Sequence, residues 1–252
     1  MYVTINGQAG LSCQSNAQNV RDTTGMEISI EANKIRKFLS KIKGKDVELS
    51  FSQDKMIATS NSNITMRGVL LEKAFNIYYN IGVGKIAGIL IKDYPEFVDK
   101  FKRFKGLVYF EKKENRLKVF DKKNSIELEV PDIQTEFKYP TIEFDDSFFI
   151  PFSDIFSDYI NDRKATLTIT TEKNKALFLS EGKYTVTNEY ETECNGGISI
   201  KFGREFVEVL SSFEKEMTFY LKNNSPLMIK EENDEMELIA MIIPEIKEWG
   251  GE

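Results

Sequence analysis

The chain has 252 residues, of which 41% are hydrophobic and 29% are charged, and its formal net charge is −6. These proportions are typical of a globular protein with one large domain or two small ones. The absence of histidine excludes Ser-His-Asp and Cys-His nucleophile systems and removes the commonest zinc ligand. Cys13 and Cys194 are too few for a disulfide framework and lack metal-ligand spacing.

No apolar run approaches the roughly 20 residues that span a bilayer. The N-terminus lacks the basic-then-apolar pattern of a secretory signal. We therefore expect an intracellular protein that makes no membrane contact. Residues 1–25 are polar and rich in Gly, Asn, Gln, Ser and Thr, and we expect them to form an N-terminal extension.

The first repeated unit begins at Met26 with a short strand, and Asn33 is a candidate cap for a helix over residues 34–42. Apolar side chains at helical spacing predict one buried face, made of Ile35, Phe38, Leu39 and Ile42. The opposite face is almost wholly basic, with Lys34, Arg36, Lys37, Lys41 and Lys43. Three strands follow, at Val47–Phe51, Met56–Thr59 and Thr65–Leu71.

A second unit contains a helix over residues 93–105, because Asp93, Pro95 and Glu96 are typical of a helix start. Its apolar stripe is Phe97, Val98, Phe101 and Phe104, flanked by Lys100, Lys102, Arg103 and Lys105. Strands at Leu107–Glu111, Arg116–Asp121 and Ser125–Val130 are separated by Lys-Glu-Asn and Lys-Lys-Asn turns. We expect the two basic helices to lie side by side on one wall.

The stretch 131–139 breaks the pattern and predicts a linker between two halves, because it is polar and prolines bound it. The third unit has a strand over 142–150, a helix capped by Ser153, and strands at Thr166–Thr171, Ala176–Ser180 and Tyr184–Glu189. The fourth has a strand at Ile198–Phe202, a helix with Phe206, Val207, Leu210 and Phe213 on one face, and strands at Met217–Leu221, Leu227–Ile229 and Glu237–Ile243. Four copies of strand–helix–three strands indicate an α+β protein with its helices on one face of antiparallel sheets.

The two basic helices are the sharpest chemical feature of an otherwise acidic chain. Clustered Lys and Arg attract nucleic-acid backbones without reading bases, although a solvated helix face can also be rich in lysine. We expect no catalytic residue, no metal site and no cofactor, because adjacent acids such as Asp145-Asp146 and Glu231-Glu232 do not converge.

Three stretches resemble the proliferating cell nuclear antigen (PCNA) family of DNA sliding clamps. Asn224–Ile229 is similar to the family's Asn/Asp-x-Pro-Leu-x-Ile/Leu strand, and Ile243–Ile246 to its near-terminal Ala-Pro-Lys/Arg-Ile/Val. Met26 to Lys41 resembles the opening strand and basic helix of the family. The order of elements agrees with a clamp over 26–246, about nine-tenths of the chain.

The resemblance implies the DNA-clamp fold: two similar domains, each of duplicated βαβββ units, with helices on the inner face of the sheets. The expected boundaries are an N-terminal extension (1–25), domain 1 (26–131), an interdomain connector (132–140), domain 2 (141–247) and a C-terminal tail (248–252). The subunits would close head-to-tail into a ring, expected to be a homotrimer with a heterotrimer as the alternative. Such a protein would be cytoplasmic in an archaeon or in the host cell of a virus.

The resemblance also implies three sets of site residues. The DNA-facing set is Lys34, Arg36, Lys37, Lys41, Lys43, Lys100, Lys102, Arg103 and Arg204. The pocket for a partner peptide is Thr59, Asn63, Ile133, Phe137, Ile243, Pro244 and Ile246. The subunit interface pairs Ser125, Ile126 and Leu128 with Tyr184, Val186 and Asn188 of the next subunit.

The expected function is therefore that of a processivity factor without enzymatic activity. It would encircle double-stranded DNA irrespective of sequence, be opened by a clamp loader, and tether DNA polymerase and other enzymes that carry a clamp-binding peptide. One alternative is a clamp-fold scaffold or transcription accessory protein without a replication role. The other is a carboxylate-dependent enzyme or an unrelated β-rich binding module.

Overall fold

The structure is a computed structural model that describes residues 26–51, 55–61, 64–71, 88–133, 142–150, 166–214 and 216–244. We call residues 26–133 the first half and residues 142–244 the second half. The first half contains β1 (Met26–Glu31), α1 (Ala32–Lys41), β2 (Val47–Phe51), β3 (Lys55–Asn61), β4 (Ile64–Leu71), β5 (Gly88–Ile91), α2 (Tyr94–Phe101), β6 (Leu107–Lys113), β7 (Arg116–Phe120), β8 (Ser125–Glu129) and β9 (Asp132–Ile133). The second half contains β10 (Asp146–Ile150), β11 (Thr166–Glu172), β12 (Lys175–Glu181), β13 (Thr185–Glu191), β14 (Ile198–Phe202), α4 (Arg204–Leu210), β15 (Met217–Leu221), β16 (Leu227–Glu232) and β17 (Met236–Ile242).

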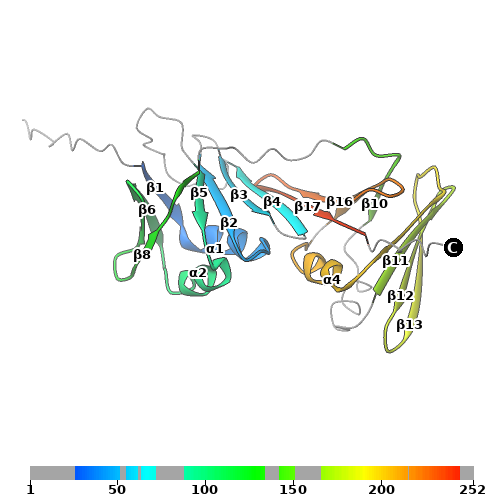
Figure 1. The fold of residues 1–252 in the computed structure, drawn as a ribbon, viewed down its shortest axis with the longest axis horizontal. Coiled ribbons are helices and arrows are strands. Elements are labelled where there is room, and N and C mark those ends of the chain that lie inside the picture. Colours follow the sequence, from blue (N-terminus) through cyan, green and yellow to red (C-terminus); the bar gives the residue numbers. More distant parts are fainter. Residues whose placement is uncertain are drawn as a thin grey trace, which may run out of the picture.

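The described strands form three antiparallel sheets, in the orders β1-β6-β7-β8, β10-β15-β16-β17-β4-β3-β2-β5-β9 and β13-β12-β11-β14. The first strand of each unit pairs with the first strand after the helix of the other unit in the same half. In the first half, β1 pairs with β6 and β5 pairs with β2. In the second half β10 joins β15 and β14 joins β11. The described helices α1, α2 and α4 all lie on the same side of the long central sheet (Figure 1). The predicted α+β architecture is therefore confirmed.

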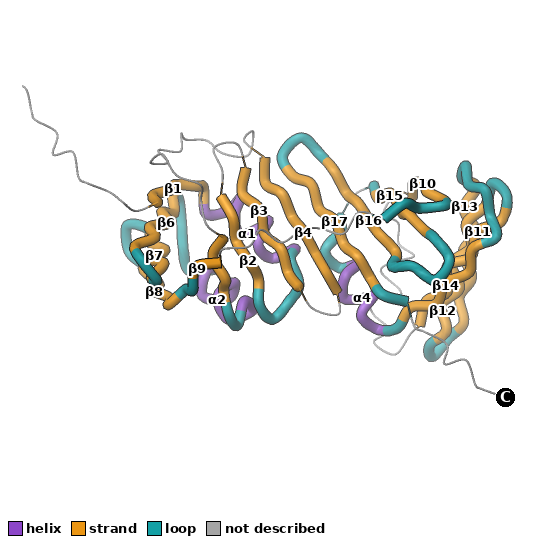
Figure 2. The backbone as a smooth tube through the Cα atoms, turned by 45° about the horizontal axis from the view of Figure 1, so that its top comes forward, coloured by secondary structure: helices purple, strands orange, loops and turns teal. Residues whose placement is uncertain are grey.

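Among the described strands, one pair joins the two halves. β17 runs antiparallel to β4, with Met236 opposite Leu70 and Ile242 opposite Ile64. The long sheet consequently continues from one half into the other without a break (Figure 2). β4 and β17 are the last strands of the first and fourth units. The last strands of the second and third units, β8 and β13, are edge strands of the two four-stranded sheets.

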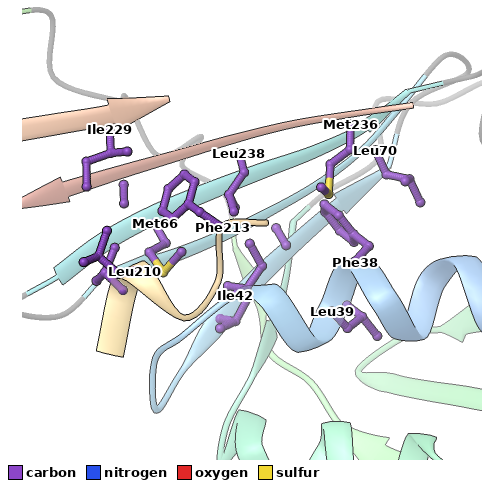
Figure 3. Close-up of a cluster of buried hydrophobic side chains, with 14 of the residues drawn as sticks. Phe38, Leu39, Ile42, Met66, Leu70, Leu210, Phe213, Ile229, Met236 and Leu238 are labelled. Carbon is purple, nitrogen blue, oxygen red and sulfur yellow. The ribbon is translucent and has the colours of Figure 1, made fainter. Parts of the chain in front are cut away.

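The hydrophobic core is continuous across this joint. Phe38 of α1 and its C-cap residue Ile42 lie in one cluster with Leu210 and Phe213 from the α4 region, beneath strands β4 and β17 (Figure 3). At Gly68, an added Cβ would lie 2.7 Å from atoms of both Phe38 and Ile42, so glycine permits α1 and its C-cap to pack directly on β4. Every residue of the predicted α1 face is at most 3% exposed, which confirms that face.

The helix termini differ from the sequence prediction. The helix α1 starts at Ala32, and its N-cap residue is Glu31, which makes no side-chain capping bond. Asn33 instead accepts a hydrogen bond from Arg36 inside the first turn, so the predicted Asn33 cap is wrong. The helix α2 ends at Phe101, four residues earlier than predicted, because the chain turns there to place Phe104 in the core.

Candidate functional site

The two basic helices lie side by side, as the sequence predicted. The hydroxyl of Tyr94 in α2 donates a 2.8 Å hydrogen bond to the carbonyl oxygen of Leu39 in α1. Tyr94 is 1% exposed, and burial raises its pKa well above the usual value, so it stays a neutral donor. The two helices therefore lie next to each other on one side of the molecule (Figure 1).

The lysines of α1 face glutamates of the second half. Lys34 Nζ lies 3.3 Å from Glu235 Oε1, and Lys37 Nζ lies 3.0 Å from Glu214 Oε2. Lys41 Nζ lies 3.6 Å from oxygens of both Glu214 and Glu231. We call these three lysines and three glutamates the lysine–glutamate row; its members line the groove where α1 meets the second half.

Lys41 is not on the helix surface, and the expectation that it faces solvent with Lys34 and Lys37 is wrong. Its side chain is 4% exposed, and that of Glu231 is 1% exposed. Its Nζ also donates a 3.0 Å hydrogen bond to the carbonyl oxygen of Ser212, so the buried ammonium is well partnered. Helical spacing placed Lys41 beside its neighbours, but the second half covers the last turn of α1.

The Lys37–Glu214 pair is on the surface, with side chains 63% and 50% exposed. The hydrogen bond from Lys37 lowers the pKa of Glu214, and the same bond raises the pKa of Lys37. At neutral pH both groups are therefore charged, and the glutamate neutralises much of the positive charge that Lys37 presents.

Arg36 and Lys43 are also partly buried. Arg36 Nη2 donates a 2.6 Å hydrogen bond to the carbonyl oxygen of Phe104, which ties α1 to the segment after α2. Lys43 Nζ donates to the carbonyl oxygen of Ser40, and burial lowers the pKa of Lys43. Arg36 therefore contributes to packing between the two helical segments, whereas the bond of Lys43 lies at the end of α1.

The helix α2 differs, because its ion pairs are internal and its C-terminal end is unpaired. Lys100 lies 2.7 Å from Glu96 one turn earlier, and Lys102 lies 2.9 Å from Asp99. Arg103 is exposed, and within the described residues its guanidinium makes no ion pair. It is the most available of the predicted DNA-facing cations with described side chains; the side chain of Arg204 lies outside that description.

Three further cations surround Arg103. Lys105, Lys122 and Lys123 are exposed and, in the described part of the chain, also lack ion pairs. The sequence analysis placed Lys105 beside the apolar stripe of the second helix, and Lys122 and Lys123 in a turn between strands, and it included none of the three in the DNA-facing set. We call Arg103, Lys105, Lys122 and Lys123 the basic corner.

Asp121 fixes the backbone conformation of the basic corner. Its carboxylate accepts hydrogen bonds from the backbone N–H groups of Lys105, Lys123 and Asn124. Asn124 Nδ2 in turn donates to the carbonyl oxygen of Arg103. Burial raises the pKa of Asp121, but the backbone hydrogen bonds outweigh it and lower this pKa to about 2. The carboxylate is therefore ionised at neutral pH and fixes the backbone of the turn against the segment after α2.

The predicted peptide pocket is described only in part. Thr59 is 8% exposed on β3, Ile243 is 60% exposed after β17, and Pro244 is half-buried beside it. The backbone of Ile133 lies in β9. Asn63, Phe137 and Ile246 lie outside the described residues, as do the Ser153-capped helix and residues 1–25, and most of the connector 132–140.

The predicted interface residues lie on the two outer edges. β8 carries Ser125, Ile126 and Leu128, and β13 and the residue before it carry Tyr184, Val186 and Asn188. Tyr184 is 70% exposed and Val186 is 37% exposed, whereas Ile126 and Leu128 are partly buried against the core. Each edge therefore combines unpaired backbone groups with apolar side chains, which is typical of a strand that binds another strand.

The described residues contain no group of three or more Asp, Glu, Cys or His side chains that could hold a metal ion. Within the same residues, no helix is long and apolar enough to cross a bilayer.

The thiol of Cys194 donates hydrogen bonds to the carbonyl oxygens of Glu172 and Lys175. Burial is the main cause that raises the pKa of this thiol. That thiol is a buried structural group.

No protein-family model and no curated protein matches the sequence. Solved structures do match the fold. PCNA from Entamoeba histolytica superposes with a TM-score of 0.69 at 13% identity, and A. fulgidus PCNA bound to the C-terminal region of FEN-1 with 0.69 at 14%. The PCNA2–PCNA3 complex from Sulfolobus tokodaii gives 0.66 at 19%, and each match covers 88% of this chain and 99% of the other. The chain therefore has the fold of PCNA-type sliding clamps over nearly its whole described length.

Proposed function

We propose that the chain is a subunit of a DNA sliding clamp, a ring that encircles duplex DNA and tethers DNA polymerase and other enzymes to it. The observation that carries this proposal is the match to complete PCNA chains, which covers 99% of each one. A whole-chain match includes both halves, the joint between them and both free edges. The function is topological and needs no covalent chemistry.

The basic corner supports contact with the DNA backbone. Arg103 and Lys105 follow α2, and the hydrogen bonds of Asp121 and Asn124 hold the Lys122-Lys123 turn against them. Exposed Lys and Arg side chains without acidic partners release counterions from phosphates without reading bases. Numerous weak contacts of this kind allow a ring to slide.

The segment after β17 supports the binding of partner peptides. Ile243 is an exposed apolar side chain beside Pro244, and one of the matching structures is a clamp bound to the C-terminal region of FEN-1. A ring that binds such peptides raises the effective concentration of an enzyme at the DNA. A clamp loader would be needed to open the ring.

The test combines native mass with DNA retention. We expect a ring-sized assembly that stays on closed circular DNA and slides off when the circle is linearised. A DNA polymerase that carries a clamp-binding peptide should become more processive in its presence. Equal retention on circular and linear DNA would contradict encirclement.

A clamp-fold scaffold without a replication role is the second candidate. The lysine–glutamate row favours it, because three lysines of α1 already have acidic partners. Ring formation without polymerase stimulation would support the scaffold.

A further inference from the structure

Two stacked aromatic side chains lie on the sheet β1-β6-β7-β8, on the face that points away from the core. Val108 and Phe110 of β6 are fully buried, so the alternation of the strand turns Tyr109 to the other face. Phe120 of β7 lies directly opposite Tyr109 in the strand register, and the ring centroids are 5.3 Å apart with the ring planes 20° from parallel. Both side chains are partly exposed. We call Tyr109 and Phe120 the aromatic pair.

Serines flank the aromatic pair on the two neighbouring strands. Ser29 of β1 lies opposite Tyr109, and Ser125 of β8 lies opposite Phe120. A serine side chain is too short to cover the face of a ring beside it. Among the described side chains, only Phe120 is stacked on the ring of Tyr109. The ring face of Tyr109 toward Ser29 can therefore stack against a further planar group.

Positive charge lies beside the aromatic pair. Lys118 Nζ is 5.3 Å from the centroid of the Phe120 ring, within the range of a cation–π interaction. Phe120 is followed directly by Asp121, whose carboxylate accepts hydrogen bonds from the backbone of the basic corner. The aromatic pair thus continues into the exposed cations of the basic corner, which lack ion pairs in the described part of the chain.

The second half contains a comparable pair of aromatic rings in a different electrostatic setting. The rings of Phe144 and Tyr220 have centroids 5.7 Å apart. The lysines close to them in sequence and register already have acidic partners, because Lys222 lies 3.7 Å from Asp145 and Lys230 lies 2.7 Å from Glu232. An aromatic pair beside unpaired cations is therefore a feature of the first half.

We propose that the aromatic pair and the basic corner bind a segment of single-stranded DNA, with a base stacked on Tyr109 and the adjoining phosphates held by Lys122 and Lys123. Aromatic rings beside a positively charged track are the means by which proteins bind single strands irrespective of sequence. Duplex DNA does not match this surface, because its bases are stacked on one another and cannot stack on Tyr109. The inference rests on the proposed function for the choice of DNA over RNA.

Acidic side chains of the same sheet indicate the direction in which the strand runs. Glu111 and Glu127 lie opposite Lys118 on its two neighbouring strands, and they would repel phosphates. On the other side of the aromatic pair are the cations of the basic corner. The single strand would therefore run from Tyr109 toward the basic corner and not toward the turn between β6 and β7.

Fluorescence anisotropy with a labelled oligothymidine of about eight nucleotides tests the stacked base. Tyr109→Leu keeps an apolar side chain on the sheet but removes the ring, and we expect it to weaken binding about tenfold, the effect typical of one stacked base. The matched control is Tyr220→Leu, which removes a ring of the second half and should leave binding unchanged. Equal losses in the two variants would overturn the assignment to Tyr109.

An abasic oligonucleotide of the same length separates stacking from an effect on the fold. It presents the same phosphates without bases, so the wild type should bind it about tenfold more weakly than oligothymidine. Tyr109→Leu should bind the two strands equally. If Tyr109→Leu weakened the binding of the abasic strand as well, the ring would act through the fold, and the stacking role would be overturned.

The phosphate contacts are tested by the salt dependence of oligothymidine binding. Lys122→Ala with Lys123→Ala should reduce the slope of log K against log salt concentration by about 1.4, since each phosphate contact contributes roughly 0.7 for a single strand. The matched control, Lys222→Ala with Lys230→Ala, removes two lysines that already have acidic partners and should leave the slope unchanged. An unchanged slope in the first variant would overturn the role of the basic corner.

Measurements on the wild type separate this inference from the proposed function. Equal affinity for oligothymidine and the abasic strand would overturn the single-strand site, although retention on closed circular duplex DNA would still support the clamp. Tighter binding of oligothymidine without retention on the circular duplex would overturn the clamp and leave the single-strand site intact. Tighter binding of an oligouridine RNA of the same length than of oligothymidine would overturn the choice of DNA.

Discussion

The helices α1 and α2 have similar basic faces in the sequence but different surroundings in the fold. Each lysine of the α1 row meets a glutamate from the second half, and Lys41 is buried there. The C-terminal end of α2 leaves Arg103 unpaired among the described residues and adds the Lys122-Lys123 turn. The comparison teaches that a basic helix face attracts an anion only where the protein has not already supplied one.

The largest effect expected from this comparison concerns Lys41. Lys41→Ala should lower the free energy of unfolding by about 3 kcal/mol, because it leaves the buried Glu231 carboxylate without its cation. Denaturant unfolding measures this loss. Lys34→Ala, which removes a more exposed pair, is the control and should cost about 0.5 kcal/mol. Equal losses would show that burial does not distinguish these lysines.

The next effect concerns DNA. Arg103→Ala with Lys123→Ala should reduce the slope of log K against log salt concentration by about 2, because each removes one phosphate contact. Titration of duplex DNA at several salt concentrations measures the slope. An unchanged slope would remove the basic corner from the DNA-binding surface.

A smaller effect concerns the shape of the basic corner. Asp121→Ala should lower the free energy of unfolding by about 1 kcal/mol at neutral pH, after allowance for solvent screening of a partly exposed carboxylate. The folded pKa of about 2 is below the usual value, so the wild-type advantage is present above about pH 4 and is lost as pH falls through 2.

Unfolding of both chains between pH 2 and pH 7 measures this prediction. Asp99→Ala, which removes an exposed partner of Lys102, is the matched control and should change stability little. A pH-independent difference between wild type and Asp121→Ala would show that the charge of Asp121 is not what anchors the turn.

The smallest effect is expected at Lys37. Lys37→Ala should change the salt slope of DNA binding by less than about 0.5, because Glu214 already neutralises this lysine. The same DNA titration measures it, at the same salt concentrations as the basic-corner variant. A slope change as large as that of a basic-corner cation would remove the distinction between the two helices.

Local patterns in the sequence determined most of the secondary structure. The strands Val47–Phe51, Ile198–Phe202 and Met217–Leu221 have the predicted bounds, since period-two alternation depends only on near neighbours. The buried face of α1 was predictable for the same reason, because Ile35, Phe38, Leu39 and Ile42 repeat at helical spacing. The repeat of four units then indicated helices on one side of antiparallel sheets.

Only the tertiary structure decided what lies opposite each charged side chain. The glutamates that meet Lys37 and Lys41 are more than 170 positions away in the sequence, and helical periodicity carries no information about them. The β4–β17 pair likewise joins strands from opposite ends of the chain. Periodicity reports which face of an element is buried, whereas the availability of a charge depends on long-range packing that brings its counterion close.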